Sequence, residues 1–160
     1  MTAPSYQGRL RGDGLRVAVV TSRFNDLVTD RLRAGCVDGL ARHGVDPASI
    51  VEASVPGALE LPLAAQRLAA SGDVDAVVCL GAVIRGSTDH HIHVGGQCAA
   101  GLARVQLDTG VPVIFGVLTT DDVAAALERA GGKMGNKGFE AAATAIEMVD
   151  LLRQLPKSAG

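Results

Sequence analysis

Apolar and polar positions alternate along this chain in a pattern that predicts four strands separated by helices. Almost unbroken apolar runs predict strands, and these runs span residues 15–20, 49–55, 75–84 and 111–118. The remaining segments have apolar side chains every three or four residues, which is the period of an amphipathic helix. The helices predicted in this way span residues 26–42, 58–70, 88–107, 121–130 and 139–155.

Alternating strands and helices, with strands that are apolar on both faces, are typical of a parallel sheet covered by helices on both sides. We therefore predict a three-layer α/β domain, doubly wound and flavodoxin-like, with a four-stranded parallel sheet. The domain is predicted to occupy residues 15–156. Polar residues 1–14 are predicted as an N-terminal arm, either extended or a stray edge strand, and residues 157–160 as a tail.

Composition narrows the class of protein. Hydrophobic residues make up 48% of the 160 positions but aromatic residues only 2%, so the core is expected to be aliphatic. The net charge of −2 comes from interspersed acidic and basic residues, which argues against nucleic-acid and membrane partners. The first residues lack the apolar stretch of a signal peptide, so we predict a cytoplasmic protein. Three cysteines lie inside apolar patterns and are predicted to be reduced core residues: Cys36, Cys79 and Cys98.

Ligands of doubly wound sheets bind at the carboxyl ends of the strands. This rule selects four loops, at residues 22–25, 56–60, 85–90 and 119–122. In the first loop, the scarce aromatic residue Phe24 either stacks on a planar ligand or packs against the following helix, and both interpretations stay open. Asn25 or Asp26 can cap that helix. In the second loop, a carboxylate such as Glu60 is favoured by the helix dipole whatever its function.

The third loop is the richest in polar side chains. Ser87 and Thr88 precede a predicted helix and suit a phosphate or carboxylate ligand, although Thr88 would serve equally as an ordinary helix cap. His90 falls in the first helical turn, where the positive helix end is expected to lower its pKa and favour a general base near neutral pH. His90 and His93 share a helix face, but no third ligand stands at a recognised spacing, so we predict no metal site.

A glycine-rich segment, predicted as a loop, is flanked by Arg129 and Lys137. It matches neither the GxxxxGK[ST] nor the GxGxxG spacing of nucleotide-binding loops. The two cations either bind an anion or only decorate the surface, and their spacing does not decide between these interpretations.

Five segments together resemble one enzyme family: RFN at 23–25, VPGALELP at 55–62, GAVIRGSTDH at 81–90, FGVLTT at 115–120 and GNKGFEAA at 135–142. Their order and spacing, from about Leu15 to Leu155, are similar to those of 6,7-dimethyl-8-ribityllumazine synthase, the penultimate enzyme of riboflavin biosynthesis. The resemblance implies a transferase that condenses 5-amino-6-(D-ribitylamino)uracil with 3,4-dihydroxy-2-butanone 4-phosphate. The products would be the ribityllumazine, phosphate and water, and the reaction would need no metal or organic cofactor.

The resemblance also implies a role for each matching residue. Phe24 would stack on the pyrimidine ring, and His90 would transfer protons. Ser87 and Thr88 would form the phosphate turn, with Arg129 also on the phosphate. The other implied substrate-binding residues are Ala58, Leu59, Glu60, Ala82, Val83, Ile84, Phe115 and Lys137.

The resemblance further implies a homo-oligomer in which each site lies between neighbouring subunits of a homopentamer. The polar arm would then add an edge strand to the neighbour's sheet. Some members of the family build an icosahedral shell from pentamers. Segment 135–138 resembles the corresponding segment of shell-forming members, which favours the larger assembly.

The chain departs from the family pattern just after His90. Members commonly continue with an aromatic, an acidic and another aromatic residue, whereas this chain has His91, Ile92 and His93. Because His90 and the phosphate turn are intact, we predict an active enzyme. The alternatives are a flavin- or lumazine-binding homologue without turnover and a shell protein that has lost catalysis. A phospho-receiver domain is discounted because residues 21–23 lack the acidic side chains that it needs.

Overall fold

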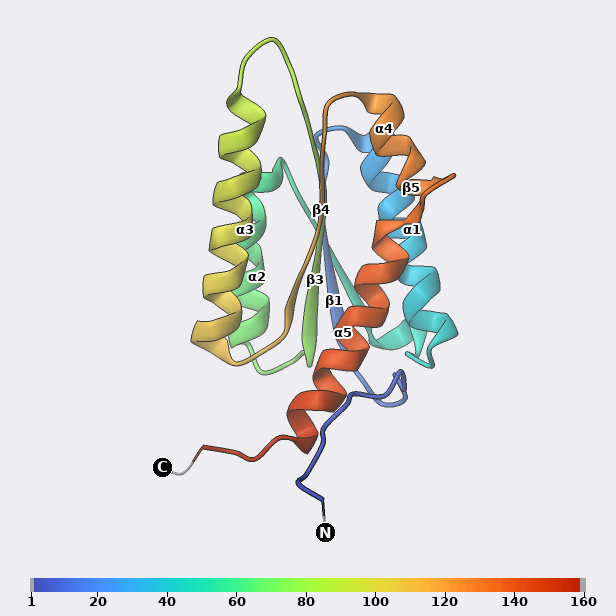
Figure 1. Ribbon diagram of the computed structural model, residues 1–160, viewed down its shortest axis with the longest axis vertical. Helices are drawn as coiled ribbons and strands as arrows, with labels where there is room; N and C mark the ends of the chain where they lie inside the picture. The colour runs from blue at the N-terminus through green and yellow to red at the C-terminus, as the bar shows by residue number, and fades with distance from the viewer. Residues whose placement is uncertain (1, 159–160) are drawn as a thin grey trace.

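The computed structural model describes residues 2–158, and these form a four-stranded parallel sheet between two helical layers (Figure 1). The strands are β1 (Val17–Ser22), β2 (Ile50–Val55), β3 (Ala76–Ile84) and β4 (Val113–Thr120). Their order across the sheet is β2-β1-β3-β4, and all three pairings are parallel. The predicted three-layer, doubly wound fold is confirmed.

Helices cover both faces of the sheet (Figure 1). One layer contains α2 (Leu61–Ala70) and α3 (His90–Thr109), and the other contains α1 (Asp26–Arg42), α4 (Val123–Glu128) and α5 (Lys137–Gln154). Two short 3-10 helices, η1 (Pro47–Ser49) and η2 (Ala58–Glu60), lead into β2 and α2. Because the strands are parallel, their carboxyl ends meet at one edge of the sheet, the upper edge in Figure 1.

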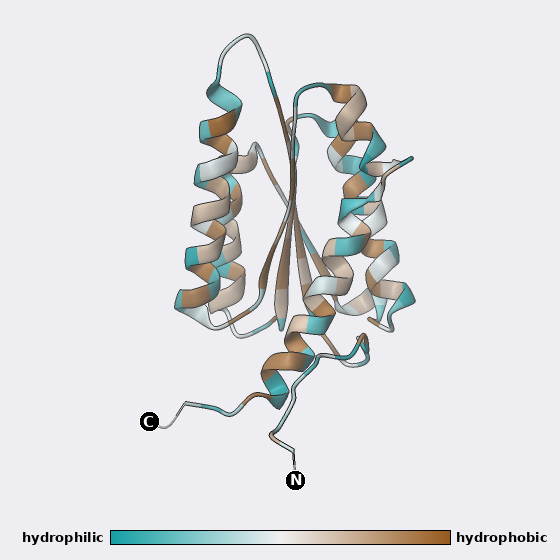
Figure 2. Cartoon of the chain, in the orientation of Figure 1, coloured by the Kyte–Doolittle hydropathy of each residue, from teal (hydrophilic) through white to brown (hydrophobic). Residues whose placement is uncertain are grey.

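The core has two parts, one on each side of the sheet. In β1 and β3, neighbouring residues are fully buried on opposite faces: Val19 packs toward one cluster and Val20 toward the other. Buried strands of this kind read as continuous apolar runs, and Figure 2 shows the strands as the most hydrophobic part of the fold. Small residues let the helices approach closely. A Cβ at Gly101 of α3 would lie only 2.8 Å from the ring of Pro62 in α2.

The three cysteines are free and buried, as predicted. Burial, with a smaller contribution from the carboxylate of Glu52, raises the pKa of the Cys36 thiol to about 12. Burial likewise raises the pKa of Cys98 to about 11 and that of Cys79 well above its ordinary range. Thiols held neutral in this way behave as small apolar side chains.

Several predicted details at the carboxyl edge are wrong. The structure has an antiparallel pair, β5 (Ala130–Gly132) and β6 (Gly135–Asn136), which reaches into the segment predicted as a loop. Helix α5 then begins at residue 137 rather than 139, because the Asn136 side-chain oxygen accepts hydrogen bonds from the first free N–H groups of the helix. Helix α4 begins at residue 123 rather than 121, because Asp122 caps it by accepting a hydrogen bond from the Ala125 N–H at 2.7 Å.

The N-terminal arm contains no strand in residues 2–13 and lies against α5 of its own chain. The Arg9 N–H donates to the carboxylate of Asp150 at 2.8 Å, and the Gln154 side chain donates to the Gln7 carbonyl at 2.7 Å. The bond from Arg9, followed by one from Gln154, lowers the pKa of Asp150. Pairing of this arm with a neighbour's sheet therefore stays a prediction. Within residues 2–158, no helix is both long and apolar enough to cross a membrane.

Candidate functional site

A cavity of about 610 Å³ opens at the carboxyl ends of β1, β2 and β3. Three loops line it, with residues 24–25 after β1, 57–60 after β2 and 82–88 at the end of β3. His90, His91 and Val94 of α3 complete the lining. This is the edge of the sheet that the strand order selects for ligand binding.

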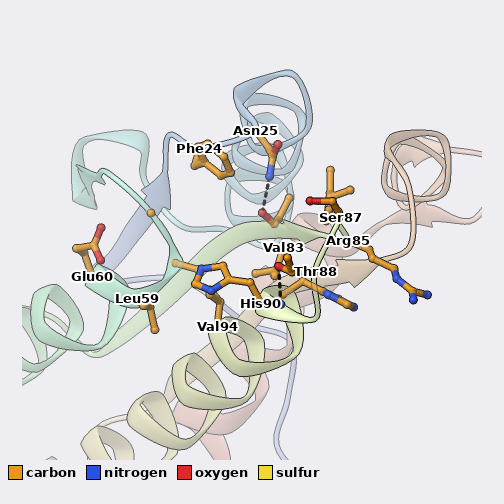
Figure 3. Close-up of a pocket in the computed structure, with 16 residues that line it drawn as sticks. Phe24, Asn25, Leu59, Glu60, Val83, Arg85, Ser87, Thr88, His90 and Val94 are labelled. Carbon is orange, nitrogen blue, oxygen red and sulfur yellow. Dashed lines mark hydrogen bonds between the residues drawn. The ribbon is translucent and has the colours of Figure 1, made fainter.

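The loop after β1 forms one wall (Figure 3). The Phe24 side chain is 73% exposed, so its ring is open to the cavity mouth and is not packed into the fold. Its backbone N–H donates to the Pro56 carbonyl at 3.0 Å, which ties this loop to the one after β2. An exposed, anchored aromatic ring fits the stacking interpretation of Phe24 better than the packing one.

Asn25, expected as a possible helix cap, does stand at the N-cap position of α1, so the expectation is right in position only. Its side chain makes no capping bond to α1 and instead donates to the Ala82 carbonyl in β3 at 2.9 Å (Figure 3). The backbone of Asn25 is left-handed, with φ 67° and ψ 48°. The signal in the sequence was weak, because asparagine tolerates this conformation but also caps helices often.

The second wall is η2, together with the end of β3. Ala58 is buried, whereas Leu59 and Glu60 are exposed toward the cavity. The Glu60 N–H donates to the Gly57 carbonyl at 3.2 Å, which closes the short turn that presents its carboxylate. Across from η2, Ala82 and Val83 are buried and Ile84 is half-buried, so β3 presents mainly backbone to a ligand.

The turn after β3 carries the hydroxyl pair. Ser87 and Thr88 are exposed, and the Thr88 Oγ1 accepts from the His90 N–H at 3.4 Å (Figure 3). Helix α3 begins at His90 and not at Thr88 as predicted, so both hydroxyls precede the helix. The Arg85 guanidinium points away from the cavity and pairs with Asp121 at 3.8 Å (Figure 3). The remaining groups form an open, polar turn that suits an anionic ligand.

The histidines differ in their surroundings. His90 is exposed at the first position of α3 and lines the cavity, while Ile92 and His93 are exposed outside it. His91 is half-buried, and its Nδ1 has no hydrogen-bond partner among residues 2–158. No group of three His, Cys, Asp or Glu side chains in that range is placed to hold a metal ion.

Three predicted site residues lie elsewhere. Phe115, on the free edge strand β4, and Lys137, at the start of α5, line a separate cavity of about 240 Å³. Arg129 is exposed and lines neither cavity, but its carbonyl accepts the Lys137 N–H at 2.8 Å, so the two cations sit on adjoining backbone. A single chain therefore brings together the predicted residues from Phe24 to His90 and leaves these three apart.

The fold defines a flavodoxin-like α/β protein, and its candidate ligand site is a cavity at the carboxyl edge of the sheet. A family model described as 6,7-dimethyl-8-ribityllumazine synthase matches residues 14–153, nearly the whole chain. The chain belongs to this family, which confirms the resemblance seen in the sequence and places the protein among the enzymes of riboflavin biosynthesis.

Proposed function

We propose that this protein condenses 5-amino-6-(D-ribitylamino)uracil with 3,4-dihydroxy-2-butanone 4-phosphate to form 6,7-dimethyl-8-ribityllumazine. One observation supports this most directly. A single cavity of about 610 Å³ collects an exposed aromatic ring, a carboxylate, a hydroxyl turn and a histidine, all within the segment that the family model matches. The pyrimidine substrate is planar and carries hydroxyl groups, and the ketone substrate is phosphorylated, so the reaction needs these groups side by side.

The pyrimidine is proposed to lie between Phe24 and the end of β3. The exposed Phe24 ring would stack on its face, and backbone groups of residues 82–84 would hydrogen-bond to its edge. Ala58, Leu59 and Glu60 line the adjoining wall, where the ribityl chain would extend. The Glu60 carboxylate is an acceptor for its hydroxyl groups.

The phosphorylated ketone is proposed to occupy the opposite side, with its phosphate at Ser87 and Thr88. The amine of the pyrimidine attacks the ketone carbonyl and, with loss of water, forms an imine. Loss of a proton from the adjacent carbon then expels phosphate and leaves an enol, which takes up a proton at its terminal carbon and becomes a second carbonyl group. The ribitylamino nitrogen attacks this carbonyl carbon and closes the ring with loss of a second water. His90 lines the cavity close to this turn and would carry the protons between these steps.

The site is proposed to be shared between copies of the chain. Phe115, Arg129 and Lys137 lie outside the cavity of their own chain, but all three are on or beside the free edge of β4 and the start of α5. A neighbouring copy that presented this surface to the cavity would add an aromatic ring and two cations beside the phosphate turn. Such head-to-tail contacts form a ring when the rotation from one copy to the next closes.

We propose a homopentamer, with the icosahedral shell as the larger form that such pentamers build. Light scattering and negative-stain electron microscopy would separate the two forms. A monomer at micromolar concentration would contradict the shared site. The two-part organisation into an arm at 1–14 and a domain at 15–156, and the cytoplasmic location, stay predictions.

The test of function is turnover. Purified protein mixed with both substrates should produce lumazine fluorescence and release an equal amount of phosphate, faster than the spontaneous reaction and equally with or without chelator. His90→Ala should slow turnover by roughly 100-fold, the usual contribution of a positioned acid–base group. His93→Ala, on the same helix but outside the cavity, is the matched control and should stay near wild type. A wild-type rate equal to background would refute the proposal, and tightly bound flavin without turnover would favour the binding-only alternative.

A further inference from the structure

Asn25 has an unusual backbone for a residue with a side chain. Among residues 2–158, it is the one non-glycine residue with positive φ, and six glycines account for the other positions of this kind. A left-handed conformation is costly for most L-residues, and asparagine is among the few that tolerate it. The chain therefore turns sharply at Asn25, directly between the Phe24 ring and helix α1.

The side chain of Asn25 replaces a missing strand residue. The pairing of β1 with β3 ends at Thr21 and Leu80, whereas β3 continues to Ile84. Beyond that point the Ala82 carbonyl faces the β1 side, and the Asn25 amide donates to it at 2.9 Å. By contrast, the side chains of Asp122 and Asn136, which precede α4 and α5, accept hydrogen bonds from the helices that they begin.

The backbone of Asn25 is also held from two sides. Its carbonyl accepts the N–H groups of Val28 and Thr29 at 3.0 Å, which fixes it to the first turn of α1. The preceding Phe24 N–H is bonded to the Pro56 carbonyl. Together with the hydrogen bond from the Asn25 side-chain amide to the Ala82 carbonyl (Figure 3), this joins the Phe24 loop to both other walls of the cavity.

We propose that Asn25 is a positioning residue, which sets the spacing between the Phe24 ring and the end of β3. This inference rests on the proposed function, because it places the pyrimidine in that gap. Asn25 itself need not touch the substrate. Its left-handed backbone sets the direction of the Phe24 ring. Its side-chain amide holds the Phe24 loop against β3, whose backbone would hydrogen-bond to the edge of the pyrimidine.

Three substitutions separate the two parts of this role. Asn25→Gly keeps the left-handed backbone and removes the amide. Asn25→Asp keeps a similar shape, but its ionised carboxylate donates no proton to the Ala82 carbonyl. Asn25→Ala removes the amide and also disfavours the backbone conformation. The control is Asp46→Gly, which removes a side-chain bond to the Ala48 N–H in the loop before β2, at the opposite edge of the sheet.

Steady-state kinetics should show a selective effect. For Asn25→Gly and Asn25→Asp, the KM for the ribitylaminouracil should rise roughly threefold to tenfold, the size expected for one lost hydrogen bond. The KM for the phosphorylated ketone should stay within about twofold, because the Ser87–Thr88 turn is untouched. Asn25→Ala should be affected most, and Asp46→Gly should keep wild-type KM values. A variant that only lost stability would lose kcat without this selectivity.

Hydrogen exchange in the free protein tests, without any substrate, whether Asn25 clamps the Phe24 loop to β3. In Asn25→Gly and Asn25→Asp, the amides of residues 24–29 should exchange roughly threefold to tenfold faster than in wild type, while those of β4 should not change. If the wild-type protein does not turn over but this exchange pattern is seen, the proposed function fails and the clamp stands. Wild-type KM values and wild-type exchange in both variants would overturn the positioning role.

Discussion

Two variants with impaired sites offer a direct test of whether each site is shared between two copies of the chain. His90→Ala damages the cavity at the carboxyl edge of β1–β3, and Arg129→Ala damages the separate surface beside β4 and α5. Each variant alone should have low activity, because every site in its oligomer carries the same defect.

The proposed sharing of each site between two copies sets how much activity a mixture should regain. In a closed ring, each site takes its cavity from one copy and its Arg129 surface from the next. After random mixing in equal amounts, a site is intact only where an Arg129→Ala copy supplies the cavity and a His90→Ala copy supplies the arginine. That happens at about one quarter of the sites, so about one quarter of wild-type activity should return. If one chain formed a whole site, no intact site would arise.

The two chains, carrying different affinity tags, are unfolded together and refolded, and assemblies with both tags are isolated. Lumazine formation is then measured at a concentration of the phosphorylated ketone below its KM, where the loss of Arg129 is felt most. Isolation through both tags shows that the chains have mixed. A mixture of wild type with His90→Ala, treated in the same way, should retain about half of the activity, which shows that refolding restores working sites. Activity of the double-tagged assembly no higher than the mean of the two parents would refute the shared site.

Three further predictions concern stability. His91→Phe removes a ring nitrogen that has no partner among residues 2–158, so the free energy of unfolding should stay the same or rise by about 1 kcal/mol; a clear fall in the urea midpoint would contradict this. Burial raises the folded-state pKa of Cys36 to about 12 and that of Cys98 to about 11. The contribution of these thiols to stability is therefore full below the unfolded-state pKa of about 8.5 and is lost as the pH rises through the folded-state pKa values. Urea midpoints should fall above about pH 9, and an equally steep fall in a Cys36→Ala, Cys98→Ala variant would argue against that cause. Gly138→Ala places a Cβ against the Leu32 carbonyl where α5 crosses α1, so it should destabilise the fold by about 2 kcal/mol or more in thermal unfolding, and an unchanged Tm would show that the helices separate freely.

Much of the site was predictable because its parts follow strands. Each of the loops after β1, β2 and β3 begins where an apolar run ends, and parallel strands deliver such loops to one edge. This rule by itself placed Phe24, Glu60 and His90 in the candidate loops before any family was considered, but it left the roles of Phe24 and Glu60 open. The rule works because burial on both faces leaves a continuous apolar signature that needs no partner to be read.

Other features carried no local signal. The β5–β6 pair is short and glycine-rich, so it has no periodicity from which to predict it. The arm at residues 2–13 is polar, and nothing in its pattern indicates that Arg9 meets Asp150, far away in the sequence, on α5. Asn25 was expected as a possible cap because asparagine often caps helix starts. Its side chain instead donates to the Ala82 carbonyl on β3, far away in the sequence.

The sequence by itself determined the alternation of strands and helices, the aliphatic core, the loops that carry chemistry and the family. Tertiary structure alone decided which of those loops share a cavity, because that depends on the strand order β2-β1-β3-β4 and not on distance along the chain. The order sets β3 beside β1, so that Asn25 reaches Ala82, and it leaves β4 as a free edge. Phe115 and Lys137 therefore face outward at that edge, away from the turn that carries His90.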